Sequence, residues 1–401
     1  MSPGGASSNA SPRYSTRNGN GSRRRARRPA SSAVGQRSMA SSFRAFLVND
    51  LFGDPALYVG LPWARRALLF DLGDISSLSA GHLLKISDVF VSHAHLDHFV
   101  GFDHLLRVLL GRTKALRLYG PPGFIDHVDG KLRAYAWNLV EGYNLSIEVH
   151  EVGPDRVRCV RFACPRGFRR EDAADSVAVD GLLVSEPEFR VRCAHLDHRI
   201  PCLGFALEET VHLNVDKTCL DALGLPVGPW LMDLKRAIRA GRPDDFPLRV
   251  AWTHGSRREE RCVALGTLRR EAVRASPGQK LVYVTDVLDS ASNHERILGL
   301  ARSADFFYCE AGYPARDVDR ARARYHLTTV EAGRLAAEAG ARRFSVFHLS
   351  PKYRDCPGEL VAEAMGAFAG GAGAFPAREG TYKPLSKNNL TGEISERHKE
   401  P

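Results

Sequence analysis

The chain has 401 residues, 44% of them hydrophobic, and a formal net charge of +10. This composition suits one large α/β domain with insertions. No run of about 18 apolar residues occurs, so no membrane span is expected. Residues 1–45 hold nine arginines and no acidic residue, so the remainder of the chain is nearly neutral. Eight cysteines are scattered without a C-x-x-C pair, which argues against a zinc ribbon or a disulfide framework and favours a reducing, cytoplasmic location.

Residues 1–42 are rich in Ser, Arg, Gly and Asn, and we expect them to form a disordered tail. Three interpretations of this tail are open. It is a solvated extension, an organelle transit segment of Arg- and Ser-rich composition, or an arm that attracts nucleic acid through the arginines of residues 23–28. A second polar tail is expected over residues 383–401, which leaves residues 43–382 for the folded domain.

The folded part begins with three predicted strands, at residues 43–48, 56–59 and 67–70, separated by Gly, Pro and Asp turns. A further apolar strand at residues 89–91 leads directly into a run of His and Asp, and helical spacing follows over residues 99–110. The polar run therefore lies on a strand-to-helix loop, where a rigid scaffold commonly presents functional groups.

This loop carries three histidines and one aspartate within six residues, which are usual zinc ligands. His93 and His95 are two positions apart in extended chain, so their rings can share one metal. Asp97 and His98 follow the bend and can face a second metal. One loop cannot complete two sites, so further ligands must come from distant segments. The alternative is a polar helix cap whose histidines are incidental.

Later segments supply more predicted elements. Strands are expected at residues 116–120, 157–162, 189–193, 281–286, 304–311 and 343–348, and helices at residues 124–139 and 330–339. Residues 165–181 are predicted to form a polar loop, and residues 208–278 to form an inserted arm. The strand at 281–286 ends in Asp286, and the strand at 343–348 ends in His348.

The pattern H-x-H-x-D-H resembles the metallo-β-lactamase superfamily, and further motifs resemble its ribonuclease Z family. Tyr119–Gly123 resembles "YGPxG", Cys202–Phe205 resembles "CxGY", and Gly224–Lys235 resembles "GxPxGPxxxxLK". The resemblance implies an α/β protein with the four-layer αββα metallo-β-lactamase fold, an inserted arm, and a two-metal hydrolase site.

The resemblance also implies a ligand set and two Zn²⁺ per chain, although Mn²⁺ or Fe suits the same donors. The "CxGY" alignment selects His198 as a ligand, with His195 as its rival. Asp286 is the expected bridge between the metals, and a simple strand-end turn is the alternative. The expected ligands are His93, His95 and His198 for one metal, and Asp97, His98 and His348 for the other.

Catalytic roles follow from the same resemblance. Glu310 lies in a segment similar to the family's "HEAT" strand, where Cys309 replaces the family's His. His326 lies in a segment similar to "GHSS/T" and is expected to protonate the leaving oxygen, with Glu310 orienting its ring; the alternative is a helix-capping His. Asp97 is expected to take a proton from water, and Asp71 to support the metal loop.

The implied substrate is precursor tRNA, cut at its 3′ trailer, and the implied assembly is a homodimer. Lys235 and Arg236 of the arm are candidate phosphate contacts, although an amphipathic surface helix with solvated cations would look the same. Lys352 and Tyr353, in a segment similar to "LxHxSxRY", are further candidate substrate contacts. Two other functions are open: hydrolysis of a small phosphodiester such as a cyclic nucleotide, and a non-catalytic RNA-binding scaffold.

Overall fold

The structure is a computed structural model that describes residues 43–177, 180–254 and 257–371. The two predicted tails, residues 1–42 and 383–401, and the last stretch of the predicted domain lie outside the described residues. Among the described residues, no helix has both the length and the apolar character that a membrane crossing requires.

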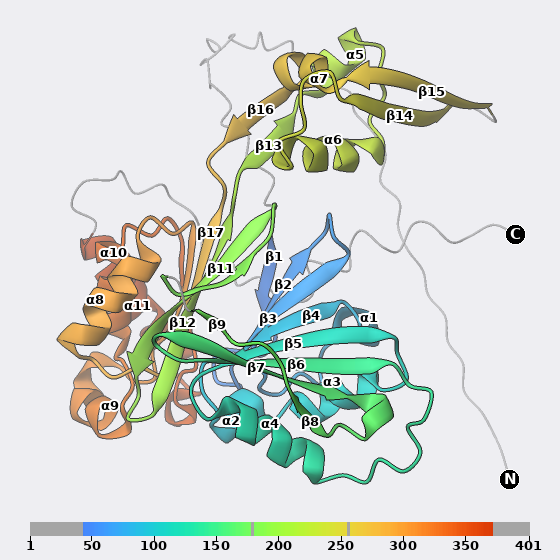
Figure 1. The fold of residues 1–401 in the computed structure, drawn as a ribbon. Helices are drawn as coiled ribbons and strands as arrows, with labels where there is room; N and C mark the ends of the chain where they lie inside the picture. Colours follow the sequence, from blue (N-terminus) through green and yellow to red (C-terminus); the bar gives the residue numbers. More distant parts are fainter. Residues whose placement is uncertain (1–42, 178–179, 255–256, 372–401) are drawn as a thin grey trace, which may run out of the picture. The chain divides into compact units, whose positions relative to one another are not determined.

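Nine strands of the described chain form a first sheet (Figure 1). Their order is β1-β2-β3-β4-β5-β6-β7-β8, and β9 pairs with β7. Strands β3 to β6 run parallel, so their carboxyl ends share one edge of the sheet. The strands are β1 Arg44–Leu47, β2 Leu57–Leu61, β3 Arg66–Phe70, β4 Ile86–Phe90, β5 Lys114–Gly120, β6 Leu145–Val152, β7 Arg156–Ala163, β8 Arg170–Asp172 and β9 Ser176–Val177.

A second sheet of six strands has the order β10-β11-β12-β17-β18-β19. Strands β17, β18 and β19 are parallel to one another, whereas β11, β12 and β17 pair antiparallel. The turn between β11 and β12 therefore lies at the edge where the last three strands end. The strands are β10 Leu182–Ser185, β11 Phe189–Asp197, β12 Pro201–Glu209, β17 Lys280–Val284, β18 Phe306–Glu310 and β19 Phe344–Phe347.

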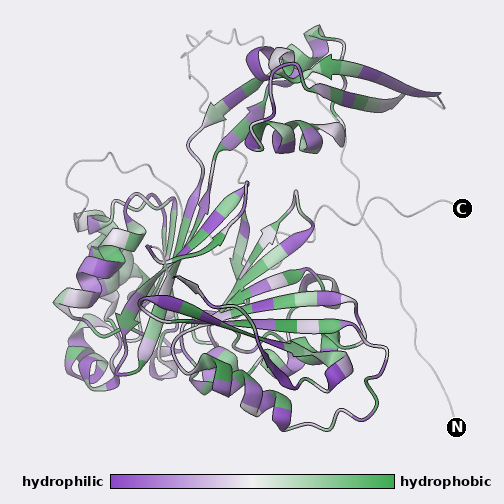
Figure 2. Ribbon diagram, viewed as in Figure 1, coloured by the Kyte–Doolittle hydropathy of each residue, from purple (hydrophilic) through white to green (hydrophobic). Residues whose placement is uncertain are grey.

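Three buried hydrophobic clusters separate four layers. Successive residues of a strand point to opposite faces, and Leu68 and Leu69 of β3 accordingly join different clusters. Leu69 packs with Phe102 and the helices beside the first sheet, whereas Leu68 packs with Phe205 of the second sheet. The opposite face of the second sheet packs against further helices through residues such as Val282. The expected αββα layering is confirmed, and Figure 2 shows the apolar faces of these elements.

Helices cover both outer faces of the sandwich. The helices on the first sheet are α1 Ala80–Leu83, α2 Leu96–Phe99, α3 Phe102–Leu109 and α4 Phe124–Arg133. The helices that follow the second sheet's strands are α8 Ala291–Ala301, α9 Val318–Arg324, α10 Thr329–Glu338 and α11 Pro357–Gly371.

The segment between β12 and β17 has elements and a core of its own. Its hydrophobic cluster is formed by buried residues including Leu220, Trp230 and Leu248. Near its base, the Arg239 guanidinium lies 3.2 Å from a carboxylate oxygen of Glu209. The elements are β13 His212–Val215, α5 Lys217–Ala222, α6 Trp230–Arg239, β14 Pro247–His254, β15 Arg257–Ala264, α7 Leu265–Glu271 and β16 Val273–Ser276.

The helix predicted over residues 99–110 is instead two helices, α2 and α3, that meet at Gly101. A Cβ atom there would collide with the carbonyl oxygen of Gly73, and the Gly101 amide donates to the carbonyl of Leu72 at 2.8 Å. This break brings the backbone after β3 against the polar loop after β4, so the glycine serves close packing rather than a simple turn.

Other elements also differ from their predicted bounds. Helix α4 ends at Arg133 instead of residue 139, and the indole Nε1 of Trp137 then donates to the carbonyl of Leu132 in the last turn at 2.8 Å. Residues 165–181, predicted as a loop, contain strands β8 and β9. Helix α11 lies where the sequence analysis placed no element.

Candidate metal centre and active site

The functional side chains lie on loops at the carboxyl ends of parallel strands. The loop Ser92–His98 follows β4, Asp286 follows β17, and His348 follows β19. The turn between β11 and β12 carries His198. The two sheets meet at this point, because the Leu203 amide of β12 donates to the carbonyl of Ser92 at 2.9 Å.

Three residues that follow strands, Asp71, Asp286 and His348, have a left-handed backbone although none is glycine. The φ angles are 57° at Asp71, 39° at Asp286 and 57° at His348. Such conformations cost on the order of 1–3 kcal/mol each and persist where surrounding contacts hold them, commonly at functional sites. The strained backbone lowers the stability of the fold, and in return it fixes the direction of these three side chains.

Four potential ligands gather on one side of the cluster. Nε2 of His93 lies 2.9 Å from Nδ1 of His95, so both nitrogens face the same point. Asp286 Oδ2 lies 3.7 Å from Nε2 of His93 and 3.6 Å from Nε2 of His198. The ligand atoms of all four residues lie within 4.8 Å of one another.

A second group lies on the other side of Asp286. Asp97 Oδ2 is 3.2 Å from Nε2 of His348 and 3.5 Å from Nε2 of His98. Asp286 Oδ2 is 3.4 Å from that same His98 nitrogen, and its Oδ1 is 2.7 Å from Nδ1 of His348. Asp286 thus faces both groups, as a bridging carboxylate must.

The hydrogen bonds of the histidines leave the correct nitrogens free for metal binding. Nδ1 of His98 lies 2.9 Å from Asp71 Oδ2, and Nδ1 of His198 lies 2.8 Å from the carbonyl oxygen of Tyr325. Each ring therefore donates through Nδ1 and presents the lone pair of Nε2. Nε2 of His98 and Nδ1 of His348 are buried without a hydrogen bond of acceptable geometry. These side chains fit a pair of divalent cations.

Asp71 supports the metal loop from behind, as the sequence analysis predicted. It is fully buried, and its carboxylate accepts from the Ser92 amide at 2.6 Å and from the Ser92 hydroxyl at 2.9 Å. The hydroxyl of Tyr283 donates to the same carboxylate at 2.9 Å. With the His98 bond, Asp71 fixes both the backbone of the loop and the orientation of one ligand.

Burial and neighbouring charges set the protonation of the cluster. Burial, reinforced by the charge of His98, lowers the pKa of His93 to about 2, so its imidazole is neutral. For Asp286, burial by itself would raise the pKa, but His348 and His98 hold it well below the usual value. Neutral imidazole and ionised carboxylate are the forms that bind metal. His98 differs: burial by itself would lower its pKa, but the Asp286 and Asp71 carboxylates raise that pKa to about 10, so a metal would have to displace its proton.

His326 and Glu310 form a pair beside the cluster. Nδ1 of His326 lies 3.1 Å from Oε2 of Glu310. His326 lies in the chain just before α10. Glu310 is fully buried and accepts backbone amide hydrogens from Val287, Gly312 and Leu327 at 3.0–3.2 Å. Burial by itself would lower the pKa of His326, but the Glu310 carboxylate raises it above the ordinary value.

The remaining predicted site residues are not among the clustered ligands of the described residues. His195 is part of β11 and is not among the clustered ligands of the described residues. Arg236 on α6 is exposed and pairs with Asp233 at 2.9 Å, and Lys235 beside it is partly buried. Lys352 lies 3.3 Å from Asp317. The Tyr353 side chain is buried, and its hydroxyl donates to the same carboxylate.

Three contributors to the site were not predicted from the sequence. They are Ser92, Tyr283 and the main-chain carbonyl of Tyr325, all of which hold ligands or their supports. A buried Ser or Tyr looks like any core residue in sequence, and a carbonyl group carries no sequence signal.

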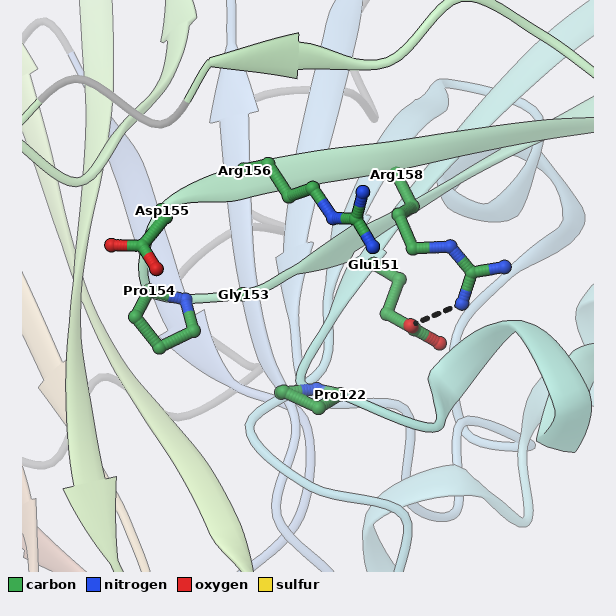
Figure 3. A pocket seen from close by; sticks show the side chains of 7 residues that line it. All are labelled: Pro122, Glu151, Gly153, Pro154, Asp155, Arg156 and Arg158. Atoms are coloured by element: carbon green, nitrogen blue, oxygen red, sulfur yellow. Dashed lines mark hydrogen bonds and ion pairs between the residues drawn. The ribbon is translucent and has the colours of Figure 1, made fainter.

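A surface pocket of about 330 Å³ at the turn between β6 and β7 has none of the clustered histidines in its lining (Figure 3). Glu151 pairs there with Arg158 at 3.0 Å, and its carboxylate accepts the Ile125 amide near the start of α4 at 3.1 Å. The carboxylate thus already occupies the positive end of that helix, so the pocket has no catalytic arrangement of its own.

An αββα sandwich with a bridged His/Asp cluster where its strands end defines a metallohydrolase of the metallo-β-lactamase fold. No protein-family model matches the chain. It is 32% identical over 308 residues to ribonuclease Z of Deinococcus radiodurans, covering 76% of this chain and 88% of that protein. The chain belongs to the ribonuclease Z family and is a metal-dependent hydrolase.

Two further similarities are more distant. Ribonuclease Z of Prochlorococcus marinus is 28% identical over 327 residues, which cover 78% of this chain and 87% of that protein. The metallo-β-lactamase fold protein YhfI from Bacillus subtilis has a TM-score of 0.46 and 17% identity, and the match covers 81% of this chain and 92% of that one.

Proposed function

We propose that this protein is an endoribonuclease that removes 3′ trailers from precursor tRNA, using two zinc ions. The observation that carries the proposal is the position of Asp286, whose carboxylate faces both groups of ligands: Oδ2 lies near His93 and His198 of one group and near His98 of the other, and Oδ1 lies near His348. Membership of the ribonuclease Z family supports the choice of substrate. A cytoplasmic location is proposed because all eight cysteines are free thiols.

The chain's side chains supply both metal positions. His93, His95 and His198 would hold one ion, Asp97, His98 and His348 the other, and Asp286 would bridge them. Bound there, the ions supply Lewis acidity for activating water and for offsetting charge on the phosphate. The same donors also suit Mn²⁺ or Fe.

Two groups of the chain handle protons. Asp97 lies at the edge of the cluster with its side chain 42% exposed, so it can accept a proton from the attacking water. His326 stands on the other side, held at Nδ1 by Glu310, and its Nε2 can donate a proton to the departing 3′-oxygen. The products are a tRNA with a 3′-hydroxyl and a trailer with a 5′-phosphate.

We assign RNA contacts to cations that are not among the clustered ligands. Arg236 is exposed on α6 and Lys235 lies next to it, where phosphate groups can be reached. Lys352 is half exposed near His348, whereas Tyr353 acts by holding Asp317 beside it. The assembly proposed is a homodimer.

The test uses purified protein with a 3′-extended tRNA, with a cyclic nucleotide, and with each substrate after chelator treatment. We expect one cut after the discriminator base, no such activity with chelator, and recovery when Zn²⁺ is restored. Efficient turnover of the cyclic nucleotide with no cut in tRNA would replace the proposal by a small-phosphodiester hydrolase. Binding of tRNA with no hydrolysis at any metal loading would make the protein a scaffold.

A further inference from the structure

The loop that carries a metal ligand and the loop that carries the proton donor are joined at the surface of the site. His198 donates to the carbonyl oxygen of Tyr325 at 2.8 Å. The next residue outward, Arg199, meets the Tyr325 side chain: its Nη1 lies 2.7 Å from the phenol oxygen, and its guanidinium carbon lies 4.8 Å from the ring centroid. The two residues adjoin His198 and His326 in the chain.

Both residues have a backbone that normally favours glycine. The φ angle is 61° at Arg199 and 62° at Tyr325. Local bonds hold each one: the Arg199 amide donates to Asp197 Oδ1 at 2.7 Å, and Tyr325 ends α9 in the left-handed position. An arginine and a tyrosine held in such conformations at the mouth of a site are oriented by the fold rather than left free.

The charge of Arg199 is available to a ligand. Its side chain is exposed, and no ion pair of the described residues joins it to a carboxylate. By contrast, Lys352 is held by Asp317. A guanidinium has five N–H donors, and one bond to the phenol leaves most of them free. The fixed pair therefore presents a planar cation, backed by an aromatic ring, directly beside His326.

We propose that Arg199 and Tyr325 form a nucleotide subsite for the nucleoside whose 3′-oxygen leaves. The guanidinium contacts a phosphate oxygen of that nucleotide, and the stacked planes support its base, since bases stack on aromatic and guanidinium faces in single-stranded RNA recognition. The position next to His326 selects this nucleotide, because His326 must reach its 3′-oxygen. The subsite rests on the proposed endoribonuclease function.

The test compares Arg199→Ala with Arg302→Ala. Arg302 is also an exposed arginine, and it follows α8 and precedes β18, at the edge of the sheet opposite the cluster. Binding of a single-stranded oligoribonucleotide is measured against salt, together with KM and kcat for a 3′-extended tRNA and for bis(p-nitrophenyl) phosphate. Zinc content is measured for every variant.

We expect Arg199→Ala to weaken oligoribonucleotide binding about tenfold and to lower the slope of log affinity against log salt by about 0.7 to 1, the value for one lost phosphate contact. KM for tRNA should rise by a similar factor, and the loss on bis(p-nitrophenyl) phosphate should be much smaller. Arg302→Ala should leave both slope and KM as in the wild type.

Two further variants separate the parts of the subsite. Arg199→Lys should restore the salt slope but only part of the affinity, because an ammonium group is not planar. Tyr325→Phe keeps the ring and removes the bond to Arg199, so affinity should fall less than in Arg199→Ala.

An unchanged salt slope in Arg199→Ala, or equal losses on RNA and on the small ester, would overturn the subsite and leave Arg199 a support for His198. Because oligoribonucleotide binding needs no cleavage, the subsite is judged even if tRNA is not cut. Failure of the wild type to cut tRNA would overturn the proposed function instead.

Discussion

Oδ1 of Asp286 lies 2.7 Å from Nδ1 of His348, while its Oδ2 faces Nε2 of His98 at 3.4 Å. Asp286 follows the end of strand β17, the parallel neighbour β18 ends at Glu310, and His348 follows the end of β19, so the sheet itself sets the spacing. Removing this one side chain should therefore disturb both metal positions together.

Asp286→Ala should lose hydrolysis and at least one bound metal. The variant removes the only residue shared by the two groups of ligands on either side of it, and leaves buried imidazoles facing one another. Metal content by elemental analysis and turnover of bis(p-nitrophenyl) phosphate check this. Asp129→Ala, at a partly exposed position of α4, is the control. A fully loaded, active Asp286→Ala enzyme would remove the bridging role.

His198→Ala and His195→Ala form a matched pair three residues apart. His198 faces the cluster, whereas His195 lies within β11 and joins no ligand group of the described residues. Loss of one zinc equivalent and of activity is expected only for His198→Ala. Zinc titration with a competing chelator measures this; loss of zinc in His195→Ala alone would reverse the assignment.

His326→Ala should keep its metals and lose rate. His326 is a proton donor in our mechanism, and loss of a general acid typically lowers the rate about 10² to 10⁴-fold. Single-turnover rates with 3′-extended tRNA and zinc content provide the readouts, with exposed His104→Ala on α3 as control. If zinc leaves together with activity, His326 is a ligand instead.

Glu310→Gln should shift the pH dependence of the reaction. The Glu310 carboxylate raises the pKa of His326, so neutralising it lowers that pKa and reduces the protonated fraction on the alkaline side. The decline of kcat at high pH should therefore begin at lower pH than in the wild type. Thermal unfolding is measured in parallel, because Glu310 also accepts three backbone amides. An unmoved alkaline limb in a folded variant would contradict the positioning role.

Replacing residues 212–276 by a short Gly-Ser linker should raise KM for tRNA and spare the small ester. This segment has its own hydrophobic cluster, so its removal leaves the three clusters of the sandwich intact. Kinetics on both substrates, with circular dichroism for folding, give the readout. Equal losses on both substrates would mean that the segment supports the catalytic body rather than RNA binding.

The sequence alone was most informative where ligands are local. One strand is followed directly by His93, His95, Asp97 and His98, so their spacing predicts shared metals before the fold is known. Asp286 and His348 could be placed through the family resemblance, since each ends an apolar strand. The choice of His198 over His195 also came from a motif, and the structure brings His198 to the cluster.

The observed helix bounds differ from the predicted ones where contacts with distant residues outweigh the helical preference of the local sequence. The apolar spacing of residues 99–110 continues across Gly101, yet the Gly101 amide donates to the carbonyl of Leu72 instead of to its own helix. Helix α4 ends at Arg133, and Trp137 turns back to donate to the carbonyl of Leu132. Periodicity reports which residues are buried, but not what approaches them.

The sequence by itself predicted which side chains would hold metal, through short spacings for His93 to His98 and through family motifs for His198, Asp286 and His348. Only the tertiary structure decided how those side chains are held: Asp71 behind His98, the Tyr325 carbonyl on His198, and Arg199 against the Tyr325 ring. The residues that these three contacts join are 27, 127 and 126 positions apart in the chain, respectively. Because they depend on main-chain atoms and on packing between sheets, no local pattern encodes them.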